Sequence, residues 1–118
     1  MNVEEIRLYC LSKREVTESF PFDEETLVFK VANKIFAIVP LERHGEIALK
    51  CDPEYAIKLR EQYDGEIVPA WHLNKKHWNG VQFADSSLSA NFVKELIDHS
   101  YKLIVKSLKK ADRERLAD

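Results

Sequence analysis

The sequence predicts a two-layer α+β fold, in which an antiparallel five-stranded sheet packs against helices in the order α-β-β-β-α-β-β-α. Apolar residues recur at three- and four-residue intervals in several stretches, which is typical of amphipathic helices. Other short runs are rich in β-branched and aromatic residues and end at turn residues, which is typical of strands. The chain has 118 residues, so we expect residues 1–118 to form one domain.

The first helix is expected to begin at Asn2, because Asn2 and the glutamate three residues later have the spacing of a capping box. Its apolar face continues at helical spacing to about residue 12. Residues 16–25 are expected to be a connector, since Pro21 restricts the preceding residue to extended conformations. We expect Phe20 and Phe22 to fold back onto the core.

Three strands are expected to follow as an antiparallel meander. Residues 26–32 and 35–39 are rich in branched and aromatic side chains, and Asn33 between them tolerates the positive φ of a tight hairpin. The third strand, residues 46–50, follows Gly45. Alternation along the first strand places these residues on one face: Leu27, Phe29 and Val31.

A helix and a hairpin are expected next. Asp52 and Pro53 suit the N-cap and first position of a helix, and Gly65 suits its end. Residues 66–73 are expected to form a strand that is either at an edge of the sheet or kinked, because Pro69 cannot donate a ladder hydrogen bond. The hairpin is completed by a turn and a fifth strand, residues 74–76 and 77–83.

The last helix is expected to begin at Ser89, a favourable N-cap residue. Apolar residues at three- and four-residue intervals continue from there, so we expect this helix to reach at least Lys110. Residues 111–118 are expected to fray.

The charge balance argues against a strongly polyanionic ligand. Eighteen Lys and Arg residues stand against twenty Asp and Glu residues, for a net charge of −2. Phosphate-binding proteins usually carry a basic surplus, although a local basic face is compatible with this total. Two cysteines and no secretory signal favour a cytoplasmic location. The apolar runs are far shorter than the ~20 residues of a membrane-spanning helix, so no membrane partner is expected.

The sequence lacks the spacings that mark catalytic or metal sites. No CxxC or HExxH spacing brings together the potential ligands Cys10, Cys51, His72 and His77. No GxSxG-type motif marks a nucleophile beside a histidine, and the scattered glycines form no phosphate-binding loop. We therefore expect a binding domain that is not an enzyme and uses no cofactor.

Residues 69–80 contain both tryptophans and two of the four histidines. One interpretation is structural, with the indoles packing across a hairpin and the lysines of its turn in solvent. The other is functional, with lysines and histidines donating to phosphate while an exposed indole stacks on a base. We favour packing for at least one tryptophan and keep the polar residues as candidate binding residues.

Seven stretches recur in the same order in one known family: residues 20–22, 27–30, 34–37, 49–53, 59–60, 72–79 and 100–101. On these stretches, of which residues 72–79 are the most specific, nearly the whole chain resembles the MmcQ/YjbR family. The resemblance implies a CyaY-like, or double-wing, fold with helices against an antiparallel sheet. It also implies a DNA-binding role, which is inferred for the family from its similarity to double-wing DNA-binding domains.

Our leading hypothesis is a small, non-enzymatic domain that binds DNA through the sheet face and the 72–79 hairpin. The candidate nucleic-acid-binding residues are His72, Asn74, Lys75, Lys76, His77, Trp78, Lys30, Lys34 and Lys50. The alternative is a protein or peptide interaction module, or self-association, through a sheet edge or an exposed aromatic patch, as secretion chaperones of similar fold suggest. A third alternative is small-molecule or metal binding.

Overall fold

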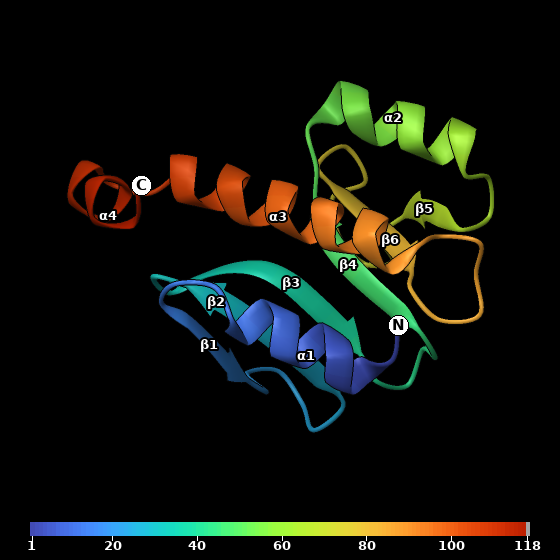
Figure 1. The fold of residues 1–118 in the computed structure, drawn as a ribbon, viewed down its shortest axis with the longest axis horizontal. Coiled ribbons are helices and arrows are strands. Elements are labelled where there is room, and N and C mark those ends of the chain that lie inside the picture. Colours follow the sequence, from blue (N-terminus) through green and yellow to red (C-terminus); the bar gives the residue numbers. More distant parts are fainter. Residues whose placement is uncertain (118) are drawn as a thin grey trace.

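A computed structural model describes residues 1–117, which form four helices and one six-stranded antiparallel sheet (Figure 1). In chain order the elements are α1 (Val3–Leu11), β1 (Val16–Ser19), β2 (Thr26–Val31), β3 (Lys34–Pro40), β4 (Glu46–Lys50), α2 (Pro53–Gln62), β5 (Ile67–Pro69), β6 (Trp78–Gln82), α3 (Ala90–Lys106) and α4 (Lys110–Leu116). The strands lie in the order β1-β2-β3-β4-β6-β5. The predicted α+β class and antiparallel sheet are confirmed, but the sheet has six strands where the sequence predicts five.

All four helices contribute to one core on a single face of the sheet. Figure 1 views the molecule from this side, with α1 and α3 in front of the strands. The core cluster takes side chains from every helix and from the inward face of the sheet, among them Ile6, Phe29, Phe36, Ile47, Leu59, Ile97 and Leu116. The predicted inward face of β2 is confirmed, because Leu27, Phe29 and Val31 belong to this cluster. The opposite face of the sheet, here called the open face, lies away from this core.

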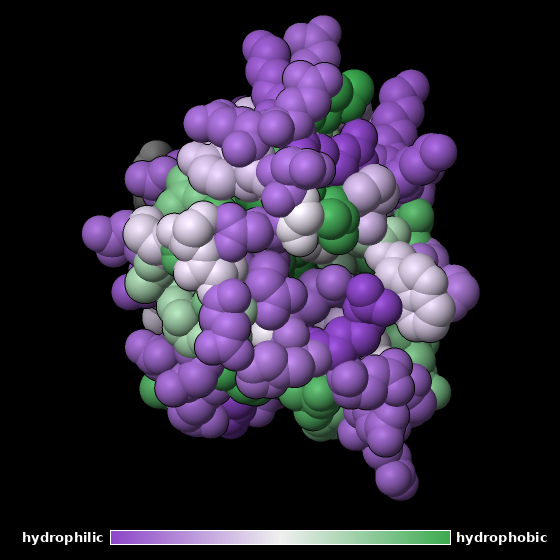
Figure 2. All heavy atoms as spheres, turned by 90° about the vertical axis from the view of Figure 1, so that its right-hand side faces the viewer, coloured by the Kyte–Doolittle hydropathy of each residue, from purple (hydrophilic) through white to green (hydrophobic). Residues whose placement is uncertain are grey.

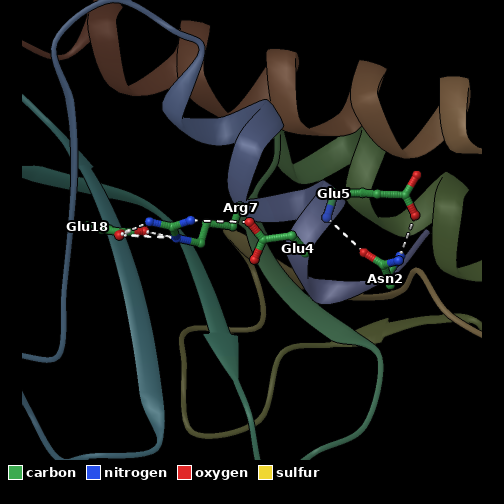
Figure 3. A network of polar contacts seen from close by, with 5 residues as sticks. All are labelled: Asn2, Glu4, Glu5, Arg7 and Glu18. Carbon is green, nitrogen blue, oxygen red and sulfur yellow. Dashed lines mark hydrogen bonds and ion pairs between the residues drawn. The ribbon is translucent and has the colours of Figure 1, made fainter.

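The first helix is fixed at its start and along its side (Figure 3). Its capping box is present as predicted: the Asn2 side chain accepts from the Glu5 N–H at 2.8 Å, and the Glu5 carboxylate accepts from the Asn2 N–H at 3.1 Å. Arg7 donates to both carboxylate oxygens of Glu18 on β1, at 2.7 and 2.8 Å, and also reaches Glu4. This bidentate pair joins α1 to the edge strand.

The segment before β2 differs from the connector that the sequence predicts. Residues 16–19 form β1, because they pair along their length with β2, from Val16 opposite Val31 to Ser19 opposite Val28. Phe20 and Phe22 are 47% and 66% exposed, so the expectation that they fold onto the core is wrong. Since the core lies on the helix side and β1 occupies the sheet edge, the connection that follows β1 stays at the surface.

The C-terminal region also differs from the prediction. The last helix does not continue to Lys110: α3 begins after the predicted N-cap Ser89 and ends at Lys106, with Ser107 as its C-cap. The Ser107 hydroxyl donates to the Ile104 carbonyl at 2.6 Å, and α4 begins three residues later. Of residues 111–118, expected to fray, residues 111–116 belong to α4 because Leu116 is buried and Arg115 pairs with Glu15 at 2.7 Å, and position 118 lies outside the described residues.

The second hairpin has shorter strands than the sequence predicts. Its strands are β5 and β6, and residues 70–77 between them form a loop. The ladder ends where the Ala70 N–H bonds the Trp78 carbonyl at 3.2 Å, after which the Asn74 carbonyl accepts from the N–H groups of His77 and Trp78 and closes a turn. The predicted edge position of Pro69 is confirmed, because β5 is the last strand of the sheet.

The sheet is held together at its middle by a side chain of α3. β3 and β4 are paired only at Ala37 with Leu49 and at Ile38 with Ala48, and the two strands diverge in Figure 1. At the divergence, the fully buried Ser100 hydroxyl donates to the Phe36 carbonyl at 2.6 Å and accepts from the Lys50 N–H at 2.9 Å. One hydroxyl thus satisfies a carbonyl of β3 and an N–H of β4, and it fastens α3 to both halves of the sheet.

Replacing Ser100 with alanine should lower the free energy of unfolding by about 1–3 kcal/mol, because the substitution leaves two buried backbone groups without a partner. Urea denaturation of the wild type and of Ser100→Ala measures this difference. Ser12→Ala is the matched control: its hydroxyl also donates to a backbone carbonyl, that of Tyr9, but at an exposed position. This control should stay within about 0.5 kcal/mol of the wild type. Equal effects of the two substitutions would contradict the role assigned to Ser100.

Candidate functional site

The open face carries a row of residues that crosses the whole sheet and has no polar side chain from β2 to β5; we call it the apolar row. The ladder registers place six residues side by side, one from each strand: Ser19, Val28, Ile38, Ala48, Gly80 and Val68. Val28 is fully buried although it lies outside the helix-side core cluster. Ile38 and Val68 are half-buried. The centre of the open face is therefore apolar.

Charge changes sign on either side of this apolar row. Toward one end lie Lys30, two residues beyond Val28, and the ladder pair of Lys50 with Trp78. We call Lys30, Lys50 and Trp78 together the basic row. Toward the other end lie Thr26, Pro40, Glu46 and Gln82. Lys50 and Glu46 are four residues apart on β4, so the change takes place over about 13 Å along the strand.

A hollow of about 260 Å³ lies at the acidic end of the open face. Its floor is apolar and comes from β3 and β4, with Ile38, Pro40 and Ala48. Phe22 and Trp71 also line it, and they are among the most exposed large apolar side chains of residues 1–117, at 66% and 59%. Exposed aromatic side chains beside a concave surface are typical of binding sites.

Arg43, Glu46 and Trp71 form a linked group in this hollow. The Glu46 carboxylate accepts from Arg43 Nε at 3.0 Å and from Nη2 at 3.2 Å, and the Arg43 guanidinium lies 5.1 Å from the centroid of the Trp71 ring. Glu46 is buried, 9% exposed, and lies over Gly80. A Cβ atom at Gly80 would approach Glu46 Cδ to 3.3 Å, so the close packing of this carboxylate favours glycine there.

Further carboxylates crowd the rim of the hollow. Glu25 lies beside Glu42, and the hydrogen bond between the two side chains raises the pKa of Glu42, with burial and charge repulsion adding to the effect. Asp23 is held by the Glu25 N–H at 2.8 Å and the Thr26 hydroxyl at 3.1 Å, which together lower its pKa. The lining of the hollow thus contains three carboxylates, Asp23, Glu42 and Glu46, against one guanidinium.

The loop before β6 carries five of the residues predicted from the sequence: His72, Asn74, Lys75, Lys76 and His77. Of these, His72 lines the hollow, its backbone is in the left-handed region with φ 61°, and its ring lies 3.8 Å from that of Trp71. Lys75 and Lys76 are exposed. The Asn74 side chain accepts from the Lys76 N–H at 2.9 Å, so its oxygen helps to shape the loop.

The remaining predicted residues divide between the two faces of the sheet. Lys30, Lys50 and Trp78 come together on the open face as the basic row. Lys34 lies apart, because its ammonium donates to the Ser107 carbonyl at the C-terminal end of α3, at 3.2 Å. Trp78 is half-buried in β6, whereas Trp71 lies in the loop, so the two indoles do not face each other across a hairpin.

Sequence reasoning missed Phe22, Arg43 and Glu46 as parts of a site. The apolar side chain of Phe22 favours a core position, which is why it was missed. The three acidic residues that follow it, at positions 23–25, are the signal in the sequence for an exposed position. Arg43 and Glu46 are only three residues apart, but nothing in the sequence shows that they meet Trp71. Their place beside Trp71 depends on the turn between β3 and β4, which only the structure places.

Neither thiol of residues 1–117 is activated as a nucleophile. Burial raises the pKa of Cys10 to about 12 and that of Cys51 to about 11, so both thiols are protonated at neutral pH. Burial also lowers the pKa of His99, whose Nε2 accepts from the Asp52 N–H at 3.2 Å. Residues 1–117 contain no group of three or more His, Cys, Asp or Glu side chains placed to hold a metal ion. No helix in this part of the chain is long and apolar enough to cross a membrane.

The fold defines a class of small α+β domains in which helices pack on one face of an antiparallel sheet. Within that class, a sequence model of the YjbR family matches residues 11–103. This chain belongs to the YjbR family, as the residues quoted from its sequence predict.

Relatives and solved structures agree with this assignment. The chain is 34% identical over 117 residues to the Escherichia coli (strain K12) protein named "Uncharacterized protein YjbR", covering 98% of each chain. It is 37% identical over 99 residues to "Uncharacterized protein YbdF" of Escherichia coli O157:H7, covering 82% of this chain and 79% of that protein. The crystal structure of Deinococcus radiodurans protein DR2400, with a DUF419 domain, superimposes with a TM-score of 0.89 at 37% identity, covering 98% of this chain and 87% of that one. The crystal structure of a Pseudomonas syringae protein superimposes with a TM-score of 0.72 at 29% identity, covering 87% of this chain and 98% of that one.

Proposed function

We propose that this protein is a non-enzymatic binding domain that takes an extended segment of a protein partner on the open face of its sheet. The observation that carries the proposal is the change of charge across the apolar row, from Lys30 and Lys50 at one end to Glu46 and the rim carboxylates at the other. A protein segment can match an apolar centre flanked by opposite charges. A nucleic acid carries negative charge along its whole length, and the acidic end would repel it.

The exposed aromatic side chains support the same proposal. Trp71 and Phe22 stand beside a hollow with an apolar floor, and aromatic residues of this kind supply much of the binding energy at protein interfaces. In contrast, the side of the molecule shown in Figure 2 is mostly hydrophilic, with apolar side chains visible only in small patches. Both cysteines are free, which suits the reducing cytoplasm that we propose as the setting.

DNA binding is the second candidate function, and the basic row supports it. Lys30, Lys50 and Trp78 share the open face, and the exposed Lys75 and Lys76 lie in the loop that leads into Trp78. Lysines beside an indole are suited to phosphate contacts and base stacking. In this case the nucleic acid would occupy the basic end of the open face and leave the hollow free.

Ile38→Glu should reduce capture of a protein partner at least about tenfold, because it places a charge at the centre of the apolar row. The measurement is recovery of each polypeptide cross-linked to the tagged protein in cells, compared between variant and wild type by quantitative mass spectrometry. Leu8→Glu is the matched control, since it adds the same charge at a 57% exposed position on α1. Identical polypeptide profiles for the two variants, both folded by circular dichroism, would contradict the proposal.

The DNA candidate predicts binding that falls steeply with salt. Replacing Lys75 and Lys76 with alanine should lower the slope of log K against log salt by about two, one for each phosphate contact removed. Fluorescence anisotropy with single- and double-stranded oligonucleotides, between low and physiological salt, measures this slope. Lys109→Ala with Lys110→Ala is the control pair, since it removes two exposed lysines from the region where α4 begins. An unchanged slope in the Lys75 and Lys76 variant would remove this loop from the DNA site.

A further inference from the structure

We propose that the hollow beside Trp71 binds an arginine side chain of the partner segment, in the place that Arg43 occupies in the free chain. The proposal rests on the proposed function and names the chemistry that the acidic end of the open face recognises. The ligand class is therefore a basic peptide whose guanidinium group enters the hollow.

The contacts of Arg43 show that the hollow suits a guanidinium group. Such a group is planar, donates to both oxygens of a carboxylate, and stacks on aromatic faces. Arg43 makes both kinds of contact, with Glu46 at 3.0 and 3.2 Å and with the Trp71 ring centroid at 5.1 Å. Its side chain is 41% exposed, whereas that of Glu46 is 11% exposed. The carboxylate is therefore the fixed part of this site, and the arginine is the part that solvent reaches.

The charges around the hollow favour an incoming cation. Asp23, Glu42 and Glu46 line it together with Arg43, and Glu25 lies beside Glu42. The lining thus holds three carboxyl groups against one guanidinium. Because like charges this close repel one another, an incoming cation gains attraction from the rim carboxylates in addition to its contact with Glu46. An acidic or neutral side chain would gain neither.

The apolar floor explains why the occupant is a side chain of a peptide rather than a free cation. The methylene stem of an arginine can pack on Ile38, Pro40 and Ala48 while its head reaches Glu46. Phe22 lies outside the helices and strands and is 66% exposed. It also lines the hollow, so it adds a second apolar surface for the stem. The peptide backbone then continues along the apolar row toward the basic end.

This arrangement makes Arg43 an internal competitor. The internal guanidinium must leave Glu46 before the partner's arginine can enter. The apparent Kd for the partner is therefore the intrinsic Kd divided by the fraction of time that Arg43 leaves the site empty. Removing Arg43 should therefore tighten the binding of a basic peptide. If Arg43 instead contacted the ligand directly, as it would with an acidic peptide, its removal would weaken binding. The sign of this change distinguishes the two cases.

The test is a titration followed by the NMR signal of the Trp71 indole N–H, which is assigned with a Trp71→Phe variant. The probes are three capped Gly/Ser pentapeptides that carry one central arginine, leucine or glutamate. The arginine peptide should shift the Trp71 signal most strongly. Arg43→Gln should lower its Kd about fivefold or more, and Glu46→Gln should raise it about tenfold. Arg113→Gln, an exposed position on α4, is the matched control and should leave Kd unchanged.

The outcomes separate this inference from the proposed function. Three results would each overturn the inference. The arginine peptide could bind Arg43→Gln more weakly than it binds the wild type, the glutamate peptide could bind the wild type more tightly than the arginine peptide does, or the arginine peptide could leave the Trp71 signal unshifted. If Glu46→Gln does not keep the wild-type amide spectrum, Glu42→Gln takes its place, because Glu42 lines the hollow at an exposed position and the loss of its charge should also weaken binding. Failure of the proposed function is read separately, from unchanged partner capture by Ile38→Glu.

Discussion

The hydroxyl of Ser100 is the contact on which the arrangement of the sheet depends. β3 and β4 share only two ladder pairs, so the sheet consists of two halves, β1-β2-β3 and β4-β6-β5, that are weakly joined to each other. Ser100 bonds Phe36 of one half and Lys50 of the other, while the neighbouring Tyr101 packs edge-on against the Phe36 ring, at 5.4 Å between centroids. The long helix α3 therefore fixes the angle between the halves from the core side.

The candidate site lies at the other end of the same short ladder. Ser100 bonds Phe36 and Lys50 beyond the pair Ala37 with Leu49, whereas the hollow lies beyond the pair Ile38 with Ala48, where Pro40 of β3 and Glu46 of β4 line it. The core contact and the candidate site thus flank the two ladder pairs that join the halves of the sheet.

Local signals in the sequence predicted most of the fold. Asn2, Asp52 and Ser89 cap their helices as predicted, and Asn33 takes the positive φ of the first hairpin, because each effect acts within three or four residues. The errors arose where tertiary contacts decide. Residues 16–19 become a strand through pairing with β2, and α4 forms where Leu116 is buried and Arg115 pairs with Glu15. The hollow was missed for the same reason, since Phe22, Arg43 and Trp71 come from three separate loops.

The central claim is that the open face binds a protein segment, and a photo-crosslinking amino acid at position 71 tests it most directly. With p-benzoylphenylalanine in place of Trp71, irradiation in cells should join the protein to a defined polypeptide at a segment rich in arginine. The same group at position 8, on the outer side of α1, should not give this product. Crosslinks to nucleic acid at position 71, or identical products at both positions, would contradict the claim.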